Sequence, residues 1–261
     1  MIGKLMKYDL KKMLRILVYI YFISLGLAII TRLINIGKDI QAIAIIGYVF
    51  SGLTYSAIGS IIVNTFVHIL RVFICGFYRD ESYLTHTLPV EKNKLLLSKY
   101  LSSLIVVFAS VFVSFLSLFI MFFSKEFMIG LKTALSSTVA GLNMSLGLLM
   151  AIIVLVIFSQ ICTMMSMAFA AVVRGNMYNQ KRVPKGLLWF ALFYFGSMIV
   201  SIAVIALIMV ISGNIADLTA AVMSQSSFVT ILISGLVLYA VYSIVFYFIC
   251  QKWFNKGVNV D

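Results

Sequence analysis

The side chains of this sequence that could do acid–base or binding chemistry gather in one short internal stretch. Residues 78–99 read YRDESYLTHTLPVEKNKLLLSK and interrupt an otherwise apolar chain. They hold three of the eight acidic residues, one of the two histidines and one of the two prolines, together with four basic residues. The stretch is either an ordinary solvated loop or a contact surface for another molecule. The apolar residues between its charges favour a contact surface.

Outside this stretch, ionisable side chains avoid the middle of the apolar segments. Ion-coupled carriers usually need an intramembrane carboxylate or histidine to carry a proton or bind a cation. All eight acidic residues lie away from the middle of these segments, and His68 alone lies well inside one, near its end. The pattern argues against a proton-driven carrier, although backbone carbonyls can bind Na⁺.

The sequence also lacks the motifs of an enzyme. It has no HExxH pattern, no paired carboxylates and no phosphate-binding GxxxxGK[ST] loop, since Gly3-Lys4 and Gly37-Lys38 lack the rest of that pattern. We therefore expect no catalytic residues, no metal site and no cofactor in this chain. If a nucleotide powers its function, ATP and Mg²⁺ must bind to a partner subunit.

The composition is that of a membrane protein. Of the 261 residues, 63% are hydrophobic and 11% are charged, whereas a soluble domain is about 25% charged. Apolar runs of 20 or more residues are long enough to cross a bilayer as helices. We predict an all-α polytopic protein with one transmembrane domain, residues 1–261. Its six spans are expected at residues 16–36, 40–77, 95–123, 142–173, 186–211 and 228–250.

The basic residues indicate how these spans are oriented. Sixteen of the twenty Lys and Arg fall on one side of a six-span topology, and only Arg32, Lys38, Lys125 and Lys132 fall on the other. Because Lys and Arg accumulate on the cytoplasmic side, both termini and residues 78–94 are predicted to be cytoplasmic. The net charge of +12 therefore reflects topology, and we expect no nucleic-acid partner.

The N-terminal residues 1–15 have an amphipathic pattern. Apolar residues recur every three or four positions, and between them stand the cations Lys4, Lys7, Lys11, Lys12 and Arg15. This pattern is typical of a helix lying in the membrane interface with its cationic face toward anionic lipid headgroups. The segment either acts only as a topology signal or also touches a cytoplasmic partner.

Polar residues recur at helical spacing within three of the predicted spans. The second span carries Ser56, Ser60, Asn64 and His68 on one face; the third carries Ser103, Ser110, Ser114 and Ser117; the fourth carries Ser159, Thr163 and Ser166. Such faces either line a translocation path or join helices through hydrogen bonds. The face from Ser56 to His68 is the candidate path, because Asn64 and His68 are costly to expose to lipid.

The polar stretch itself is built like a docking element. Residues 82–88 can form a short helix with Tyr83, Leu84 and Leu88 as an apolar strip. Pro89 would end that helix, because proline cannot donate to the helical ladder. Glu91 then stands at the start of the next helix, where the helix dipole favours a negative charge.

In this stretch the sequence resembles the type-2 permeases of ATP-binding-cassette exporters, in particular the short permeases of Gram-positive bacteria. Those permeases show a pattern close to FYRD…DEGYLTxTLPV…LLLSK after their second span, and Ser82 stands here in place of the glycine. The matching residues are Phe77, Tyr78, Arg79, Asp80, Glu81, Tyr83, Leu84, Thr85, Thr87, Leu88, Pro89, Val90, Leu96, Ser98 and Lys99. The six-span layout and the amphipathic N-terminus agree more generally.

The resemblance implies a function in export. Residues 78–94 would carry a coupling helix that docks on a cytoplasmic ATPase through Asp80, Glu81, Tyr83, Leu84, Thr85, Thr87, Leu88 and Pro89. A second permease subunit would complete the transporter in the bacterial plasma membrane, and the cargo would be a hydrophobic or amphipathic peptide, antibiotic or lipid-like molecule. The alternative is a non-transporting immunity or sensor protein that binds a membrane-active peptide.

Overall fold

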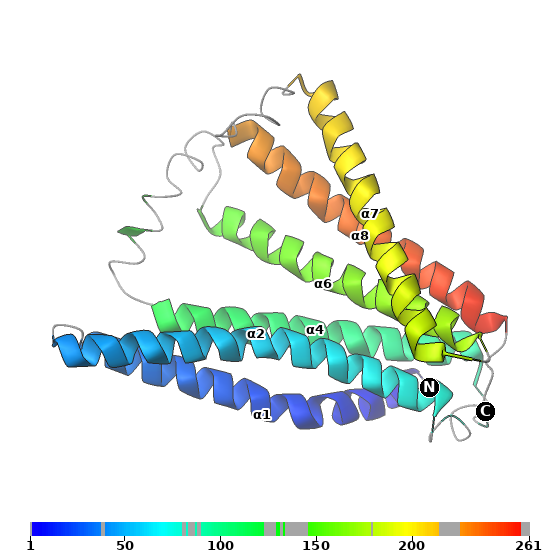
Figure 1. Ribbon diagram of the computed structural model, residues 1–261, viewed down its shortest axis with the longest axis horizontal. Coiled ribbons are helices and arrows are strands. Elements are labelled where there is room, and N and C mark those ends of the chain that lie inside the picture. Colours follow the sequence, from blue (N-terminus) through cyan, green and yellow to red (C-terminus); the bar gives the residue numbers. More distant parts are fainter. Residues whose placement is uncertain are drawn as a thin grey trace. The chain divides into compact units, whose positions relative to one another are not determined.

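The computed structural model describes residues 2–37, 40–79, 82, 87, 90–122, 129–130, 133, 146–178, 180–213 and 225–256. Six long helices make up nearly all of the described residues, none of which is in a strand (Figure 1). They are α1 (Ile2–Ile36), α2 (Gln41–Tyr78), α4 (Lys92–Phe122), α6 (Leu146–Asn176), α7 (Arg182–Ile211) and α8 (Gln225–Asn255). Each is long and apolar enough to cross a membrane. The predicted all-α membrane fold with six spans is confirmed.

Neither proline of the chain interrupts a helix interior. Of the two prolines in the sequence, Pro89 precedes α4 and Pro184 stands in the first turn of α7. The first N–H groups of a helix have no partner within it, so proline at that position removes no hydrogen bond. The apolar runs can therefore continue as unbroken helices.

The first two helices are longer than a single crossing requires. The expected interface helix, residues 1–15, and the first span form one continuous helix of 35 residues, α1. Lysine and leucine are good helix formers, so nothing in the sequence breaks the helix between the two segments. At ~1.5 Å per residue α1 is about 52 Å long and the 38-residue α2 about 57 Å, against ~30 Å of hydrocarbon. Both helices are therefore long enough to extend beyond the hydrocarbon core.

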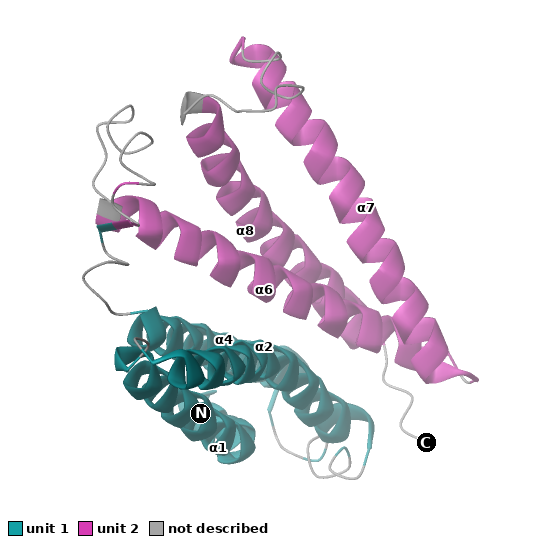
Figure 2. Ribbon diagram, turned by 60° about the vertical axis from the view of Figure 1, so that its left-hand side comes forward, with its two compact units in different colours: residues 1–129 teal, residues 130–261 magenta. Residues whose placement is uncertain are grey.

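The helices form two compact units, Met1–Ile129 and Gly130–Asp261 (Figure 2). In unit 1, α1 packs against both α2 and α4, which touch each other less. In unit 2, α6 packs against both α7 and α8, and α7 touches α8 less. Each unit is thus a three-helix group organised around its first helix.

Polar side chains join the helices of unit 1 at several levels. Tyr21 of α1 and Thr65 of α2 both hydrogen-bond the hydroxyl of Ser110 on α4. Thr31 of α1 bonds Thr54 of α2 at 2.7 Å. The hydroxyl of Ser24 on α1 donates to Ser117 of α4 at 3.2 Å. At Ser110 and Ser117 the serine face of α4 therefore joins helices through hydrogen bonds. Of the two roles considered for this face, lining a path or packing helices, these contacts support packing.

In unit 2, hydrogen bonds between polar side chains likewise join α6 to α8. The Thr163 hydroxyl donates to the carbonyl oxygen of Tyr239 at 2.7 Å, and the hydroxyls of Ser166 and Ser243 bond at 3.1 Å. Thr163 and Ser166 are buried. The polar face predicted on the fourth span also joins helices at these two positions.

Candidate functional site

A buried ion pair lies at the end of unit 1 from which residues 79–91 leave α2. The Nζ atom of Lys99, in the second turn of α4, lies 2.9 Å from Oδ1 of Asp9 on α1. The side chains retain only 9% and 17% of their exposure, and the Ser98 hydroxyl lies 3.5 Å from Oδ2 of Asp9. The pair joins two segments that are 90 positions apart in the sequence.

The end of α2 encloses the same ammonium group. The Lys99 Nζ atom lies 5.3 Å from the centre of the Phe77 ring, which gives it a cation–π contact. A Cβ atom at Gly76 would come within 2.8 Å of Nζ, so glycine leaves the room that the lysine occupies. Three helices therefore meet at one buried charge pair, within a few residues of the point where α2 ends.

The pair links the N-terminal segment to both helices that border residues 79–91. Charges taken out of water need a close partner and further polar contacts, and removing one member of such a pair costs far more than breaking a surface pair. The ends of α1, α2 and α4 are therefore held as one body at this position. A force on residues 79–91 would reach all three helices.

Most of the predicted ATPase-coupling residues lie outside the described part of the chain: Asp80, Glu81, Tyr83, Leu84, Thr85, Leu88 and Pro89. Of the predicted set only Thr87 is described, together with the neighbouring Ser82. Ser82 is buried and its N–H donates to the carbonyl of Arg79 at 2.7 Å, while Thr87 is exposed. Glu91 directly precedes α4, as expected, and its carboxylate bonds Lys94 at 3.1 Å in the solvent-exposed first turn. The coupling role of residues 78–94 stays a prediction.

The N-terminal cations line the side of α1 that faces away from its packed stripe. Lys4, Lys7, Lys11, Lys12 and Arg15 are all exposed. The packed stripe begins at Asp9 and continues through Met13 and Leu17. The four cations other than Lys12 follow the helical repeat about half a turn from that stripe. This segment thus presents the exposed cations Lys4, Lys7, Lys11 and Arg15 on one face while its other face packs within unit 1. Its contact with lipid headgroups stays a prediction.

The candidate translocation stripe of α2 lies outside the interior of unit 1. Ser56 and Asn64 are exposed, and the Asn64 amide donates to the Ser60 carbonyl of its own helix at 2.8 Å. The interior side of α2 carries Thr54 and Thr65 instead. Ser56 and Asn64 therefore stand on a side of α2 that does not pack within unit 1.

His68, the last residue of this stripe, contacts α1. Its Nε2 atom lies 3.4 Å from the carbonyl oxygen of Lys12. The end of α2 thus packs beside the cationic segment of α1, as does the base of α4.

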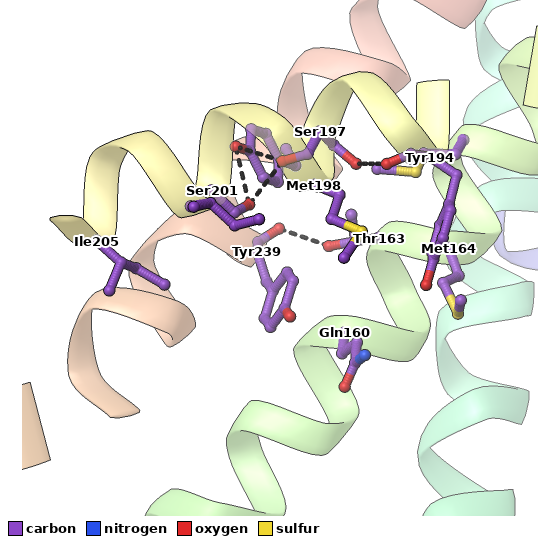
Figure 3. A pocket seen from close by; sticks show the side chains of 12 residues that line it. Gln160, Thr163, Met164, Tyr194, Ser197, Met198, Ser201, Ile205 and Tyr239 are labelled. Carbon is purple, nitrogen blue, oxygen red and sulfur yellow. Dashed lines mark hydrogen bonds between the residues drawn. The ribbon is translucent and has the colours of Figure 1, made fainter. Parts of the chain in front are cut away.

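Unit 2 contains a pocket of about 150 Å³ between α6, α7 and α8 (Figure 3). Its apolar wall includes Met164, Met198 and Ile205. Its hydroxyl groups are mostly engaged: the Ser201 hydroxyl donates to that of Tyr242, which donates to the Ser197 carbonyl. Such a lining suits an uncharged apolar or amphipathic group. The volume is below the ~300 Å³ of a drug-sized site, so it would hold only a side chain or part of an acyl chain.

The sequence patterns did not indicate the Asp9–Lys99 pair or the pocket. Asp9 stands among five nearby cations, and Lys99 is one of three lysines around the start of the third predicted span. Nothing in their spacing selects one acid–base pair across 90 positions. The only signal is that Asp9 lies four residues before Met13 in the apolar repeat, which puts a carboxylate on a face that packs.

The chain matches no protein-family model, no curated protein and no solved structure.

Proposed function

We propose that this chain is the membrane subunit of an ATP-driven exporter and that residues 78–94 dock on a separate ATPase subunit. The proposal rests on the resemblance of residues 77–99 to type-2 permeases and on the six membrane-spanning helices. In this account both termini and the docking segment are in the cytoplasm of a bacterial cell. The ATPase binds ATP and Mg²⁺, and two permease subunits, identical or different, complete the transporter.

The buried Asp9–Lys99 pair is the observation that supports this proposal most strongly. A docking segment can drive a membrane subunit only if its movement is passed to the helices rather than absorbed at their ends. The segment lies between α2 and α4, and the pair fixes α4 to α1 beside the last turn of α2. An ATPase that pulled on residues 78–94 would therefore move three helix ends together.

The proposed cargo is a hydrophobic or amphipathic molecule. The pocket of unit 2 presents methionine, tyrosine and hydroxyl groups and no charged side chain. The stripe of Ser56, Ser60, Asn64 and His68 gives unit 1 a polar surface outside its packed interior. The predicted exterior connections are short, which offers little for capturing a substrate outside and favours export over uptake.

Site-directed crosslinking tests the proposal. A photoreactive amino acid placed at Tyr83 should capture, in the native host, a cytoplasmic ATPase that carries a phosphate-binding loop. The same residue at Lys125, on the predicted exterior, should capture none. Failure to capture an ATPase from position 83 would contradict the proposal.

A variant of the captured ATPase then distinguishes an exporter from a non-transporting immunity or sensor protein. Replacing its phosphate-loop lysine should abolish extrusion of the cargo and any resistance that depends on it. Resistance that persists without ATP hydrolysis would identify a non-transporting immunity or sensor protein.

A further inference from the structure

Arg174, near the end of α6, is enclosed by aromatic rings from three parts of unit 2. Its guanidinium carbon lies 5.6 Å from the ring centre of Tyr178, 5.2 Å from that of Trp189 on α7 and 5.3 Å from that of Trp253 on α8. The two tryptophan rings also contact each other edge to face at 5.9 Å. We call Arg174, Tyr178, Trp189 and Trp253 the arginine cage.

The backbone brings these residues together at one tight crossing. A Cβ atom on Gly175 would lie 2.7 Å from Cα of Gly186 and 2.8 Å from the carbonyl oxygen of Arg182. Only glycine allows α6 and α7 to approach so closely. Lys181, just before α7, has a φ of 54°, in the left-handed region that suits a sharp turn. The close approach of α6 and α7 therefore brings Arg174, Tyr178 and Trp189 together, and α8 adds Trp253.

The hydrogen-bonding capacity of Arg174 is largely unused. One Nη1 group points to the sulfur of Met177 at 3.6 Å, a weak acceptor, and the Nε–H is buried without an acceptor. No carboxylate of the described residues pairs with it. Aromatic faces stabilise the cation but leave its N–H edge without an oxygen. A guanidinium in this state favours an anion that can accept two parallel hydrogen bonds.

The surrounding charge is also positive. Lys185 lies 4.1 Å from the centre of the Tyr178 ring, and Arg182 begins α7. Residues 130–261 contain only two acidic residues, Asp217 and Asp261. Asp217 lies in the connection between the far end of α7 and the start of α8. Among the residues of unit 2 that the structure describes, none is acidic.

The position of the cage suggests where its anion comes from. Tryptophan is enriched at membrane–water interfaces, and both tryptophans of the chain belong to the cage. Basic pockets between membrane helices bind lipid headgroups at this depth. We propose that the arginine cage binds the phosphate group of an anionic phospholipid, with the Arg174 N–H edge on the phosphate oxygens.

Tryptophan fluorescence gives a direct test, because the only two tryptophans report on the cage. The full chain would be reconstituted in phosphatidylcholine vesicles containing phosphatidylglycerol, with bromine on the acyl chains of one lipid or the other. Brominated phosphatidylglycerol should quench the emission several-fold more than brominated phosphatidylcholine at the same mole fraction. Equal quenching by the two lipids would overturn the proposal.

Variants test whether Arg174 causes the stronger quenching by brominated phosphatidylglycerol. R174Q should bring the ratio of the two quenching constants close to one, and R174K, which keeps the charge but loses the planar fork, should give an intermediate ratio. K252Q is the matched control, since Lys252 is an exposed cation next to Trp253 on α8; it should leave the ratio unchanged. A lipid preference that R174Q and K252Q reduce equally would indicate non-specific surface charge and refute the site.

A test with inorganic phosphate distinguishes the two possible ligands, a lipid phosphate group and a soluble phosphate ion. Millimolar inorganic phosphate should neither change the emission in pure phosphatidylcholine vesicles nor displace brominated phosphatidylglycerol. Displacement by free phosphate would assign the cage to a soluble anion and overturn the lipid proposal. Helix content by circular dichroism, equal in wild type and variants, ensures that each comparison is made on folded protein.

Discussion

The ammonium group of Lys99 and the carboxylate of Asp9 form an ion pair of 2.9 Å between α4 and α1, with little exposure to solvent. The last turn of α2 covers the lysine through Phe77 and Gly76. The amphipathic N-terminal segment is therefore attached to the helices that border residues 79–91, while its cations Lys4, Lys7, Lys11 and Arg15 are exposed.

Removing one partner of this pair should destabilise the chain strongly. D9L leaves the Lys99 ammonium group and K99M leaves the Asp9 carboxylate without its partner, so for each we expect a loss of about 3 kcal/mol in the free energy of unfolding. Unfolding of the purified chain in mixed micelles with increasing denaturing detergent measures this. K94A is the control, because the Lys94–Glu91 pair is 50% and 70% exposed and should contribute about 0–1 kcal/mol.

The double variant D9L/K99M distinguishes an ion pair from two independent packing sites. With both charges removed, stability should return to within about 1.5 kcal/mol of wild type, because an apolar pair can replace a buried ion pair. A loss equal to the sum of the two single losses would show that the residues do not interact.

Gly175 should tolerate no side chain. G175A places a methyl group against the backbone of Gly186 and Arg182, and backbone cannot move aside as a flexible side chain does. Overpacking of this kind costs about 1–3 kcal/mol, and we expect a thermal unfolding midpoint well below that of wild type. G147A, on the same helix with open space around it, should be neutral or slightly stabilising. Equal midpoints for the two variants would contradict the close crossing.

Two adjacent polar residues of α2 should behave differently. T65V removes the bond to Ser110 across the unit and should cost roughly 0.6 kcal/mol, the average for an interhelical bond in membranes. N64L removes only a bond to its own helix on an exposed side and should leave stability within about 0.5 kcal/mol. The same unfolding titration compares them. A larger loss in N64L would show that Asn64 packs rather than faces a path.

The sequence could predict the helices because the apolar runs exceed the length of a membrane crossing and no proline stands in their interior. It placed the start of α7 four residues late, at Gly186 instead of Arg182, because hydropathy falls at a basic residue while the helix does not end there. For the same reason the charge pattern separates residues 1–15 from the first predicted span, whereas α1 runs unbroken from Ile2 to Ile36.

Long-range pairings could not be predicted in the same way. Trp189 and Trp253 lie 15 and 79 positions after Arg174, and no helical period relates them. Ser110 shares its polar face with Ser103, yet Ser110 bonds two other helices while the Ser103 hydroxyl donates to the Lys99 carbonyl of its own helix. Which polar residue meets which depends on helix rotation and crossing, and hydrophobic pattern alone does not determine these.

The proposed orientation predicts a pattern of accessibility. In a variant whose native Cys75, Cys162 and Cys250 are replaced, single cysteines at Lys38, Lys125 or Asp217 should react with a membrane-impermeant thiol reagent in intact cells. Cysteines at Glu81, Lys181 or Lys256 should react only after the cells are opened. Mass-shift labelling reads out both sets, and reaction at position 81 from outside would reverse the topology.

Coupling to an ATPase is the central claim, and the most direct test measures binding and export together. If residues 82–88 dock as a short helix, Tyr83 and Leu84 are its apolar anchors, and such anchors often contribute more than ~2 kcal/mol each. Y83A and L84A should weaken copurification of the ATPase by about 30-fold and abolish ATP-dependent export, while K94A leaves both unchanged and all three variants insert normally. Retained ATPase binding and full export in Y83A and L84A would contradict the account.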